Sequence, residues 1–251
     1  MRNNNNYINM YKIIKHTFLI VMLSFVVCVA NAQQSWDYPV KPGMEAWKQL
    51  QSNKEMVNAC QIPENVISSL STEELTELCL RYPLIHDIFA FNNLNSGLDK
   101  LFNDFNGIKE LYQRSDVLIC ITMRYSQKMQ SFSFLDGINT DYKKGEFIAN
   151  VSLLEVLLSR CVMQNDAKLE EYKDVLRILL SGYENKFMYS DYFMGLGFRS
   201  NVYSRAHIIF KLDKQNIENL PQKDKNSVFY SGMADEESMR VIDELCYKLI
   251  K

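Results

Sequence analysis

Histidine serves both metal binding and proton transfer near neutral pH, and it is rare in this chain. It occurs only as His16, His86 and His207. His86 is followed directly by Asp87, whereas His207 lies far along the chain. A zinc site needs three or four ligands, and neither an H-E-x-x-H motif nor a C-x-x-C pair is present to supply them. We therefore expect no metal site, and we interpret His86 and His207 as ordinary polar or capping residues.

Nucleophilic catalysis would require a serine or cysteine beside a base. Ser204 and His207 are three residues apart and would share one face of a helix, whereas Cys161 could meet His207 only through the tertiary fold. No Gly-x-Ser-x-Gly elbow is present to expose the serine. The run Gly195-Leu196-Gly197 resembles part of a dinucleotide loop, but it lacks the third glycine, a preceding strand and the later acidic residue. The sequence therefore predicts no catalytic residue and no cofactor.

One segment has a composition typical of binding surfaces. Residues 183–203 contain seven aromatic side chains in 21 positions, against 12% aromatic residues in the whole chain. Glycines and Arg199 lie among them and Arg205 follows closely, and aromatic residues with arginine are enriched at binding hot spots. The alternative is a corner between helices where the aromatic side chains fill the core. The predicted partner-binding residues are Tyr189, Tyr192, Phe193, Phe198, Arg199, Tyr203 and Arg205.

The elements that must position these residues follow an N-terminal targeting segment. Residues 17–32 read TFLIVMLSFVVCVANA, an apolar run that ends in Ala30-Asn31-Ala32 and is preceded by three basic residues. A basic start, an apolar middle and small residues before the cleavage point are typical of a secretory signal peptide. We therefore expect residues 1–32 to be a signal peptide. The exported product would begin at Gln33 and be periplasmic or extracellular.

Two other interpretations of the N-terminus are open. A retained membrane anchor would need about 20 apolar residues, whereas the uncharged run covers only 17–32 and is broken at Asn31. A lipoprotein acylated at Cys28 would need small residues before the cysteine, but Val26 and Val27 stand there. Export with cleavage is the prediction, and it leaves no transmembrane segment in the mature chain.

The mature chain, 33–251, has the composition of a globular protein. It carries 25 basic and 30 acidic side chains. A net negative charge disfavours phosphate backbones, so we expect no nucleic-acid partner. Hydrophobic residues make up 47% of the full chain, and no long Ser, Pro or Gly tract is present, so we expect a folded segment. About 220 residues are enough for one domain.

The mature chain has five cysteines, an odd number that cannot pair fully within one chain. Cys79 and Cys120 lie inside apolar runs, where a thiol packs as a small hydrophobic group. An oxidising compartment permits one or two disulfides, and Cys60 and Cys79 are the nearest pair in sequence. We expect mostly buried free thiols.

Helical patterns dominate the mature chain. Ser71-Thr72-Glu73-Glu74 has the form of a capping box, and the apolar residues after it recur at helical spacing. No stretch of six residues alternates cleanly between apolar and polar, which disfavours strands. The longer predicted helices span about 44–60, 115–129, 147–160, 166–186, 200–212 and 234–250, and residues 131–145 are predicted to form a loop.

The predicted fold class is all-α. We expect an extended lead-in at 33–43 and a single helical domain at 44–251. The domain would hold roughly eight to ten helices in an irregular antiparallel array. The helices recur without a fixed period, so a regular solenoid is not predicted.

Three runs carry a resemblance to other proteins, namely KPGMEAWKQL, IPENVISSLSTEEL and SRAHIIFK. They resemble small exported helical proteins of Gram-negative gut bacteria. The resemblance implies export and a helical fold. Because that group has no assigned activity, it implies no site residues.

These features lead to one expected function and one alternative of another class. We expect an exported helical domain of the cell envelope that binds a protein or a small ligand without catalysis. The alternative is a hydrolase whose site is assembled from distant residues. A deep pocket that brings His86 or His207 together with carboxylates would favour the enzyme, whereas a solid core with a shallow aromatic groove would favour binding.

Overall fold

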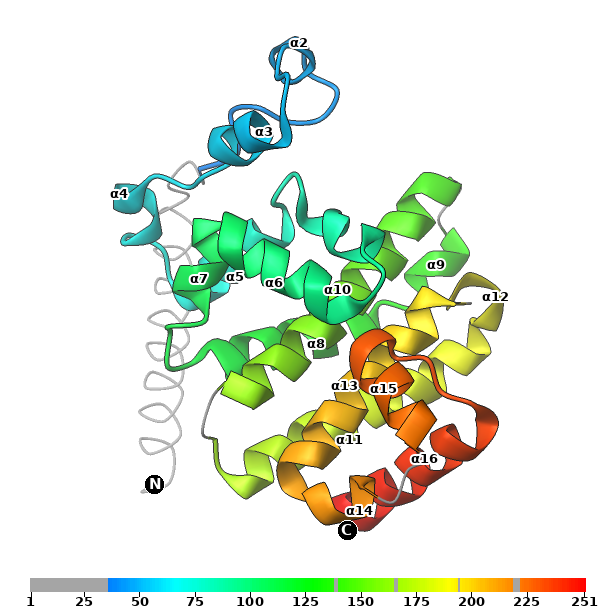
Figure 1. Cartoon of the computed structure of the whole chain (residues 1–251). Coiled ribbons are helices and arrows are strands. Elements are labelled where there is room, and N and C mark those ends of the chain that lie inside the picture. The colour runs from blue at the N-terminus through cyan, green and yellow to red at the C-terminus, as the bar shows by residue number, and fades with distance from the viewer. Residues whose placement is uncertain (1–35, 138–139, 165–166, 194, 219–221) are drawn as a thin grey trace, which may run out of the picture. The chain divides into compact units, whose positions relative to one another are not determined.

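The computed structural model describes residues 36–137, 140–164, 167–193, 195–218 and 222–251 (Figure 1). In these residues 76% of positions are helical and no strand is present, so the fold is all-α, as predicted. Nine of the described α-helices have seven or more residues. The chain divides into two units, Met1–Asp37 and Tyr38–Lys251. The predicted signal peptide at 1–32 lies outside the described residues.

The first helical segment of the second unit differs from its prediction. In place of one helix over 44–60, the structure has α2 (Glu45–Lys48) and α3 (Asn53–Ala59). The Ser52 side chain accepts a hydrogen bond from the Glu55 amide at 3.2 Å, and the Glu55 carboxylate accepts one from a preceding backbone amide at 2.8 Å. Because this capping arrangement starts a new helix at Ser52, the first helix ends before it.

The capping box at Ser71 is confirmed. Ser71 Oγ accepts from the Glu74 amide at 3.3 Å, and the Glu74 carboxylate accepts from the Ser71 amide at 2.8 Å. These bonds lower the pKa of the Glu74 carboxyl. They start α5 (Thr72–Leu80), which follows the one-turn helix α4 (Glu64–Ile67).

After α5 the chain forms the 3₁₀ helix η1 (Ile85–Ala90), then α6 (Leu94–Asp104) and α7 (Asn106–Leu111). α6 packs against η1, and α7 packs against α5. The Asn106 side chain accepts from the Ile62 amide at 3.0 Å and donates to the Ile62 carbonyl at 2.7 Å. These two hydrogen bonds hold the segment after α3 against the start of α7.

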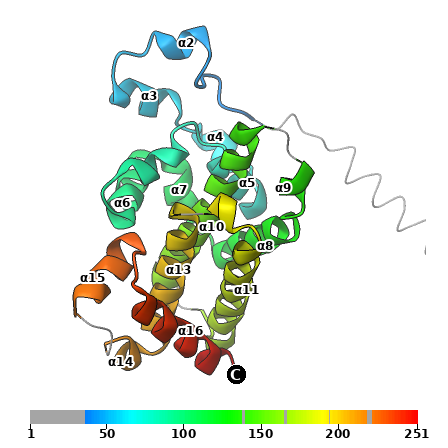
Figure 2. The ribbon, with the colours of Figure 1, turned by 90° about the vertical axis from the view of Figure 1, so that its right-hand side faces the viewer.

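The interior of the unit is formed by α8 (Val117–Gln130), α10 (Asp141–Gln164), α11 (Leu169–Met188) and α13 (Leu196–Leu212). α10 packs against α8 and α13, and α11 packs against α13; Figure 2 shows α10, α11 and α13 together. The start predicted for α11 at Asp166 lies outside the described residues. The shared core is mostly apolar and includes Val151, Leu154, Leu158, Leu176, Leu179 and Ile208.

The loop predicted at 131–145 is partly helical. It contains α9 (Phe134–Gly137), and α10 begins within it at Asp141. Phe132 and Leu135 are buried, and the Phe132 ring stacks on Phe193 with 5.0 Å between centroids. Aromatic packing therefore stabilises helical turns where the glycine and asparagine content favours a loop.

The remaining elements surround α13. They are α12 (Ser190–Phe193), α14 (Lys214–Ile217), α15 (Gln222–Ser231) and α16 (Glu236–Ile250). Gly232 joins α15 to α16 with φ +69°, and a Cβ there would lie 2.0 Å from the Arg199 carbonyl oxygen, so the position requires glycine. None of the described helices combines the length and apolar character that crossing a membrane requires.

Candidate functional site

Polar side chains meet in the interior between α8, α10, α11 and α13. Glu155 on α10 is at the centre, and Lys186 Nζ on α11 donates to its two carboxylate oxygens at 2.6 and 2.7 Å. Tyr125 and Asn201 donate to Oε1 at 2.7 Å each, and Ser200 donates to Oε2 at 2.6 Å. All five side chains are 0% exposed. We call these five residues the Glu155 cluster.

The two charges of the Glu155 cluster compensate each other. Burial lowers the pKa of the Lys186 ammonium, and the Glu155 carboxylate opposes that shift. Lys186 also donates to the Gly197 carbonyl at 2.5 Å and lies 5.3 Å from the centroid of the Phe193 ring. A buried ion pair adds little net stability over apolar packing, but losing one partner is costly. The cluster therefore joins four helices, and none of its five side chains is exposed to solvent.

A further buried charge, Arg205, extends the cluster along α13. Its Nε donates to Asn201 Oδ1 at 2.9 Å, and its Nη1 donates to Asp243 on α16. The guanidinium lies 4.1 Å from the centroid of the Tyr183 ring, a cation–π contact. The Asp243 side chain is 34% exposed, so the ion pair between Arg205 and Asp243 connects the interior to the surface of α16.

Neither Glu155 nor Lys186 is among the predicted site residues, although both carry a signal in the sequence. Glu155 stands alone as a charge within the apolar run 151–158. Lys186 follows Tyr172 and Leu179 at steps of seven residues, so it falls on the apolar stripe of α11. A charge at a core position indicates a buried group that needs a partner.

The predicted partner-binding segment is divided between the interior and the surface. Phe193, Tyr203 and Arg205 are buried, with exposed fractions of 0%, 2% and 0%. Phe193 stacks on Phe132, and the Tyr203 hydroxyl donates to Asn95 Oδ1. These three side chains complete the core, and their burial removes them from the predicted binding surface.

The other four predicted residues lie at the surface. Tyr192 is exposed, and Tyr189, Phe198 and Arg199 are half-buried. The Phe198 ring packs against the exposed Phe187 with 5.1 Å between centroids. A partner-binding role for these four residues stays a prediction.

The two candidate nucleophiles, Ser204 and Cys161, belong to the core. Ser204 Oγ is buried within hydrogen-bond distance of the Glu155 and Ser200 carbonyls. Cys161 has no exposed surface. None of the five described cysteines forms a disulfide, and four of them are buried. Burial raises the pKa of the Cys246 thiol to about 11. A buried thiol that stays protonated is a poor nucleophile.

The two described histidines have different surroundings, and neither gathers several carboxylates. His86 is exposed on η1, next to Asp87. His207 is half-buried, and Glu218 lies near it, but the Glu218 carboxylate pairs with Lys214 at 3.8 Å. Within the part of the chain that the structure describes, no three His, Cys, Asp or Glu side chains lie close enough together to hold a metal ion.

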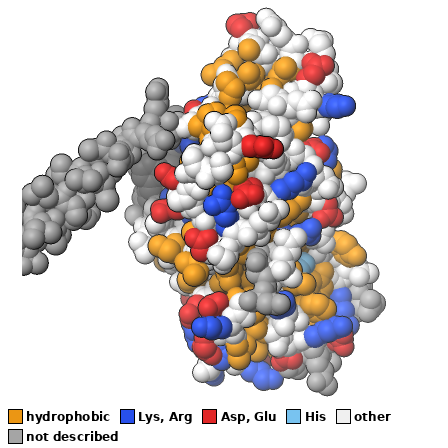
Figure 3. Space-filling model, turned by 90° about the vertical axis from the view of Figure 1, so that its left-hand side faces the viewer, with side chains coloured by type: hydrophobic (Ala, Val, Ile, Leu, Met, Phe, Trp, Pro, Cys, Tyr) orange, Lys and Arg blue, Asp and Glu red, His pale blue; other side chains and the backbone are white. Residues whose placement is uncertain are grey.

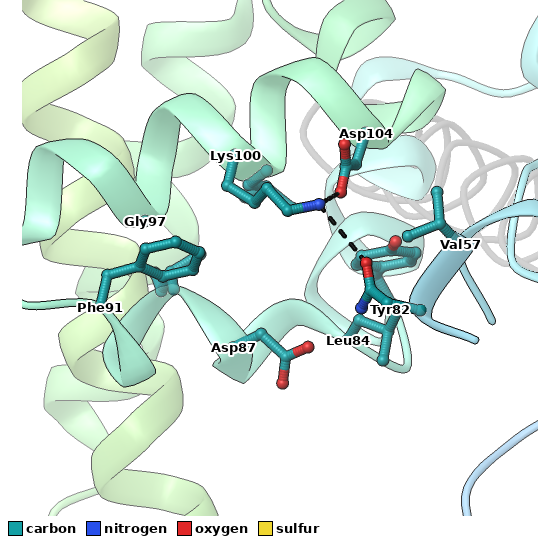
Figure 4. Close-up of a pocket in the computed structure, with 11 residues that line it drawn as sticks. Val57, Tyr82, Leu84, Asp87, Phe91, Gly97, Lys100 and Asp104 are labelled. Carbon is teal, nitrogen blue, oxygen red and sulfur yellow. Dashed lines mark hydrogen bonds and ion pairs between the residues drawn. The ribbon is translucent and has the colours of Figure 1, made fainter. Parts of the chain in front are cut away.

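A small pocket opens between α3, η1 and α6 (Figure 4). Its volume is about 130 Å³. Lys100 and Asp104 line one side, and Asp87 lies on the opposite side in the view of Figure 4. We call it the Asp87 pocket. Its apolar walls are formed by Val57, Tyr82, Leu84, Ile88, Phe91 and Leu101.

The charges of the Asp87 pocket are not balanced. Lys100 pairs with Asp104, and its Nζ lies 3.4 Å from Asn53 Oδ1. Among the described residues, no hydrogen bond or ion pair reaches the Asp87 carboxylate. Partial burial raises the pKa of the Asp87 carboxyl, and the charges of His86 and Lys100 oppose the shift. The pocket therefore presents one carboxylate that a ligand could neutralise.

Gly97 allows the close approach of α6 to η1 that shapes the pocket. A Cβ on Gly97 would lie 2.1 Å from the Ile88 carbonyl oxygen. Any side chain would therefore force the two elements apart. Ile88 and Leu101, which line the pocket beside this contact, are both buried.

On the face shown in Figure 3, basic and acidic side chains are mixed among hydrophobic ones, so neither sign of charge dominates this face.

Comparisons of the chain with protein-family models, with curated proteins and with solved structures find no match. The function is therefore inferred from the residues of this chain alone.

Proposed function

We propose that this protein is an exported binding domain of the cell envelope that holds an apolar group with a positively charged end in the Asp87 pocket. The observation that best supports the proposal is the pocket itself, because apolar walls meet a carboxylate without an ion-pair partner among the described residues. The export part rests on the signal-peptide pattern of residues 17–32.

The size of the Asp87 pocket limits the occupant. Its volume is about 130 Å³, whereas sites for drug-sized ligands have about 300–1,000 Å³. The pocket therefore fits one side chain of a partner protein or the end of a small ligand. Phe91 lines the pocket and is 39% exposed, so its ring can cover an inserted chain.

The charge of the pocket favours a cation. A partly desolvated carboxylate is stabilised in its ionised form by a nearby positive charge, and Lys100 is already paired with Asp104. A lysine or arginine side chain has an aliphatic stem and a charged end. Its stem would contact Val57 and Leu84 while its charge would lie beside Asp87.

The hydrolase alternative has less support from the geometry. It requires a nucleophile and a base within reach of each other. Ser204 and Cys161 are buried, and no serine or cysteine is among the described residues that line the Asp87 pocket. His86 and Asp87 are adjacent in sequence, but the described residues of the pocket offer them no serine or cysteine to activate.

Two probes of equal length and opposite charge test the pocket. We expect n-butylammonium to shift the amide NMR signals of η1 and α6 at lower concentration than butanoate does. Asp87→Asn should remove this preference. Asp191→Asn, which changes an exposed acidic residue on α12, should leave it unchanged. Equal binding of both probes, or a preference that survives Asp87→Asn, would contradict the proposal.

Export has a separate test. N-terminal sequencing of the protein recovered from the periplasm or the medium should begin at Gln33. A recovered chain that begins at Met1 would contradict cleavage and leave the binding proposal to its own test.

A further inference from the structure

A larger cleft lies between α6, α13, α14 and α15. Its volume is about 710 Å³, within the range of about 300–1,000 Å³ that small-molecule sites occupy. We call it the His207 cleft. Its lining includes Asn95, His207, Phe210, Lys225 and Phe229.

The hydrogen bond of His207 determines which ring nitrogen carries the proton. Nδ1 lies 2.8 Å from the Tyr203 carbonyl oxygen, which can only accept, so Nδ1 is the protonated nitrogen. Burial lowers the pKa of His207 to about 4, so the ring is neutral near pH 7. Nε2 therefore keeps a lone pair, and no hydrogen bond to it is formed by the described residues. Because His207 lines the cleft, Nε2 is the ring nitrogen that could accept a hydrogen bond from a ligand.

Aromatic rings form flat walls beside this acceptor. The Phe229 ring lies edge-on to His207 with 5.1 Å between centroids, and Phe210 lies edge-on to Phe229 at 5.5 Å. Asn95 Nδ2 donates to the Phe229 carbonyl at 3.1 Å, and Asn95 Oδ1 accepts from the Tyr203 hydroxyl. Because both ends of this amide are used, α15 is held against α6 and the walls are fixed. Flat apolar walls favour a planar ligand.

The charges around the cleft favour an anion. Glu218, which also lines the cleft, is paired with Lys214 at 3.8 Å. Lys225 lines the cleft, is half-buried and forms no ion pair with any described residue. Among the described residues, one positive charge is therefore left without an ion-pair partner at the edge of the aromatic walls.

We propose that the His207 cleft binds a small aromatic anion that carries an O–H or N–H donor. The ring would lie against Phe210 and Phe229, the donor would bond to His207 Nε2, and the anionic group would pair with Lys225. This site is independent of the Asp87 pocket, whose preferred ligand has the opposite charge.

Three related probes test the assignment by isothermal titration calorimetry. They are 4-hydroxyphenylacetate, phenylacetate, which lacks the donor, and tyramine, which replaces the anion with a cation. We expect 4-hydroxyphenylacetate to bind most tightly. Phenylacetate should bind about fivefold more weakly, the effect of one net hydrogen bond, and tyramine about tenfold more weakly, the effect of reversing one charge contact.

Variants assign each contact to its residue. Lys225→Gln should weaken 4-hydroxyphenylacetate about tenfold without weakening tyramine, whereas Lys248→Gln, at an exposed lysine on α16, should change neither. His207→Phe should make 4-hydroxyphenylacetate and phenylacetate equal. If His207→Phe does not fold, the probe series and Lys225→Gln still decide.

Three results would each overturn the proposal. They are the absence of 4-hydroxyphenylacetate binding at millimolar concentration, equal binding of tyramine, and binding that Lys225→Gln leaves unchanged. None of these results affects the n-butylammonium test of the Asp87 pocket, so the proposals for the two sites are tested independently.

Discussion

The Glu155 cluster and the Asp87 pocket both place charged groups against apolar side chains, but they differ in how many hydrogen bonds the carboxylate accepts from the described residues. In the cluster, the Glu155 carboxylate accepts hydrogen bonds from four side chains, and all of them are fully buried. In the pocket, no described residue donates to the Asp87 carboxylate, and its neighbour Lys100 has a side chain that is 45% exposed.

The difference separates polar groups that hold the fold from polar groups that are available to a ligand. Buried polar groups are costly unless each one is paired, so a satisfied network is a requirement of the interior. A charge at the edge of a pocket keeps part of its hydration and can exchange it for a ligand. The two regions should therefore respond in opposite ways to substitution.

The largest effect is expected in the cluster. Lys186→Met leaves the Glu155 carboxylate buried without its counter-charge, which should lower the free energy of unfolding by about 3–5 kcal/mol. Urea unfolding followed by far-ultraviolet circular dichroism measures this loss.

Two further variants serve as controls for that measurement. The double variant Glu155→Leu with Lys186→Met removes both charges, so it should be less destabilised than Lys186→Met alone. Lys48→Met breaks the exposed pair with Glu45 and should cost less than about 1 kcal/mol. A cost below about 1 kcal/mol for Lys186→Met would show that the buried pair does not hold the helices together.

The next effect compares two neighbours in the predicted partner-binding segment. Phe193 is 0% exposed and Tyr192 is 37% exposed. Phe193→Ala should cost about 3–5 kcal/mol, because it leaves a cavity beside Lys186 and Phe132. Tyr192→Ala should cost less than about 1 kcal/mol. Thermal unfolding of the two variants measures both, and equal losses would mean that the segment is uniformly core.

Local patterns in the sequence predict most of the fold. The capping box at Ser71, the apolar stripe of α11 and the acidic first turn of α16 each depend on residues within one helix, and the structure contains all three. One error, the helix predicted over 44–60, comes from a local cap at Ser52 that the prediction missed. The other occurs where distant residues decide: the loop predicted at 131–145 becomes helical because Phe132 packs on Phe193.

The sites are less predictable for the same reason. Glu155 and Lys186 are 31 positions apart, and only helix packing makes them partners. The composition of aromatic residues with arginine in 183–203 does not distinguish a binding surface from a core that holds cations, because Arg205 over Tyr183 and Lys186 over Phe193 use the same contacts internally. The Asp87 pocket combines side chains from three elements, so no single run of residues signals it.

His207 is intermediate between the Glu155 cluster and the Asp87 pocket. Its Nδ1 donates to the Tyr203 carbonyl, whereas no described residue forms a hydrogen bond with its Nε2. Its pKa is lowered from 6.5 to about 4, chiefly by burial. Between these values the unfolded chain binds more protons than the folded one, so stability rises with pH across this window and is lost as pH falls. The contribution of His207 to this loss should be up to about 3 kcal/mol.

Unfolding free energies measured from pH 4 to pH 7 test this dependence by comparison with His207→Gln. The variant should lose less stability than the wild type as the pH falls, because it has no imidazole to protonate. Carboxylates contribute to both curves equally, so the difference between the curves isolates His207. Parallel curves would show that the ring titrates as it does in the unfolded chain.

The smallest effect on stability is expected in the Asp87 pocket. The pKa of the Asp87 carboxyl is raised by partial burial, so the folded chain holds this proton more tightly than the unfolded chain does. The stability of the fold therefore falls as pH rises through the titration of Asp87, whereas it rises with pH through the titration of His207. Asp87→Asn removes the charge without changing the shape. It should leave the unfolding free energy at neutral pH within about 0.5 kcal/mol of the wild type, and any change within that range should be stabilising.

Asp104→Asn is the matched control, because it breaks the ion pair with Lys100 and should be slightly destabilising, by less than about 1 kcal/mol. Chemical unfolding of the two variants side by side gives the comparison. If Asp87→Asn were the more destabilising of the two, the Asp87 carboxylate would have a structural partner, as Glu155 does, and it would not be free for a ligand.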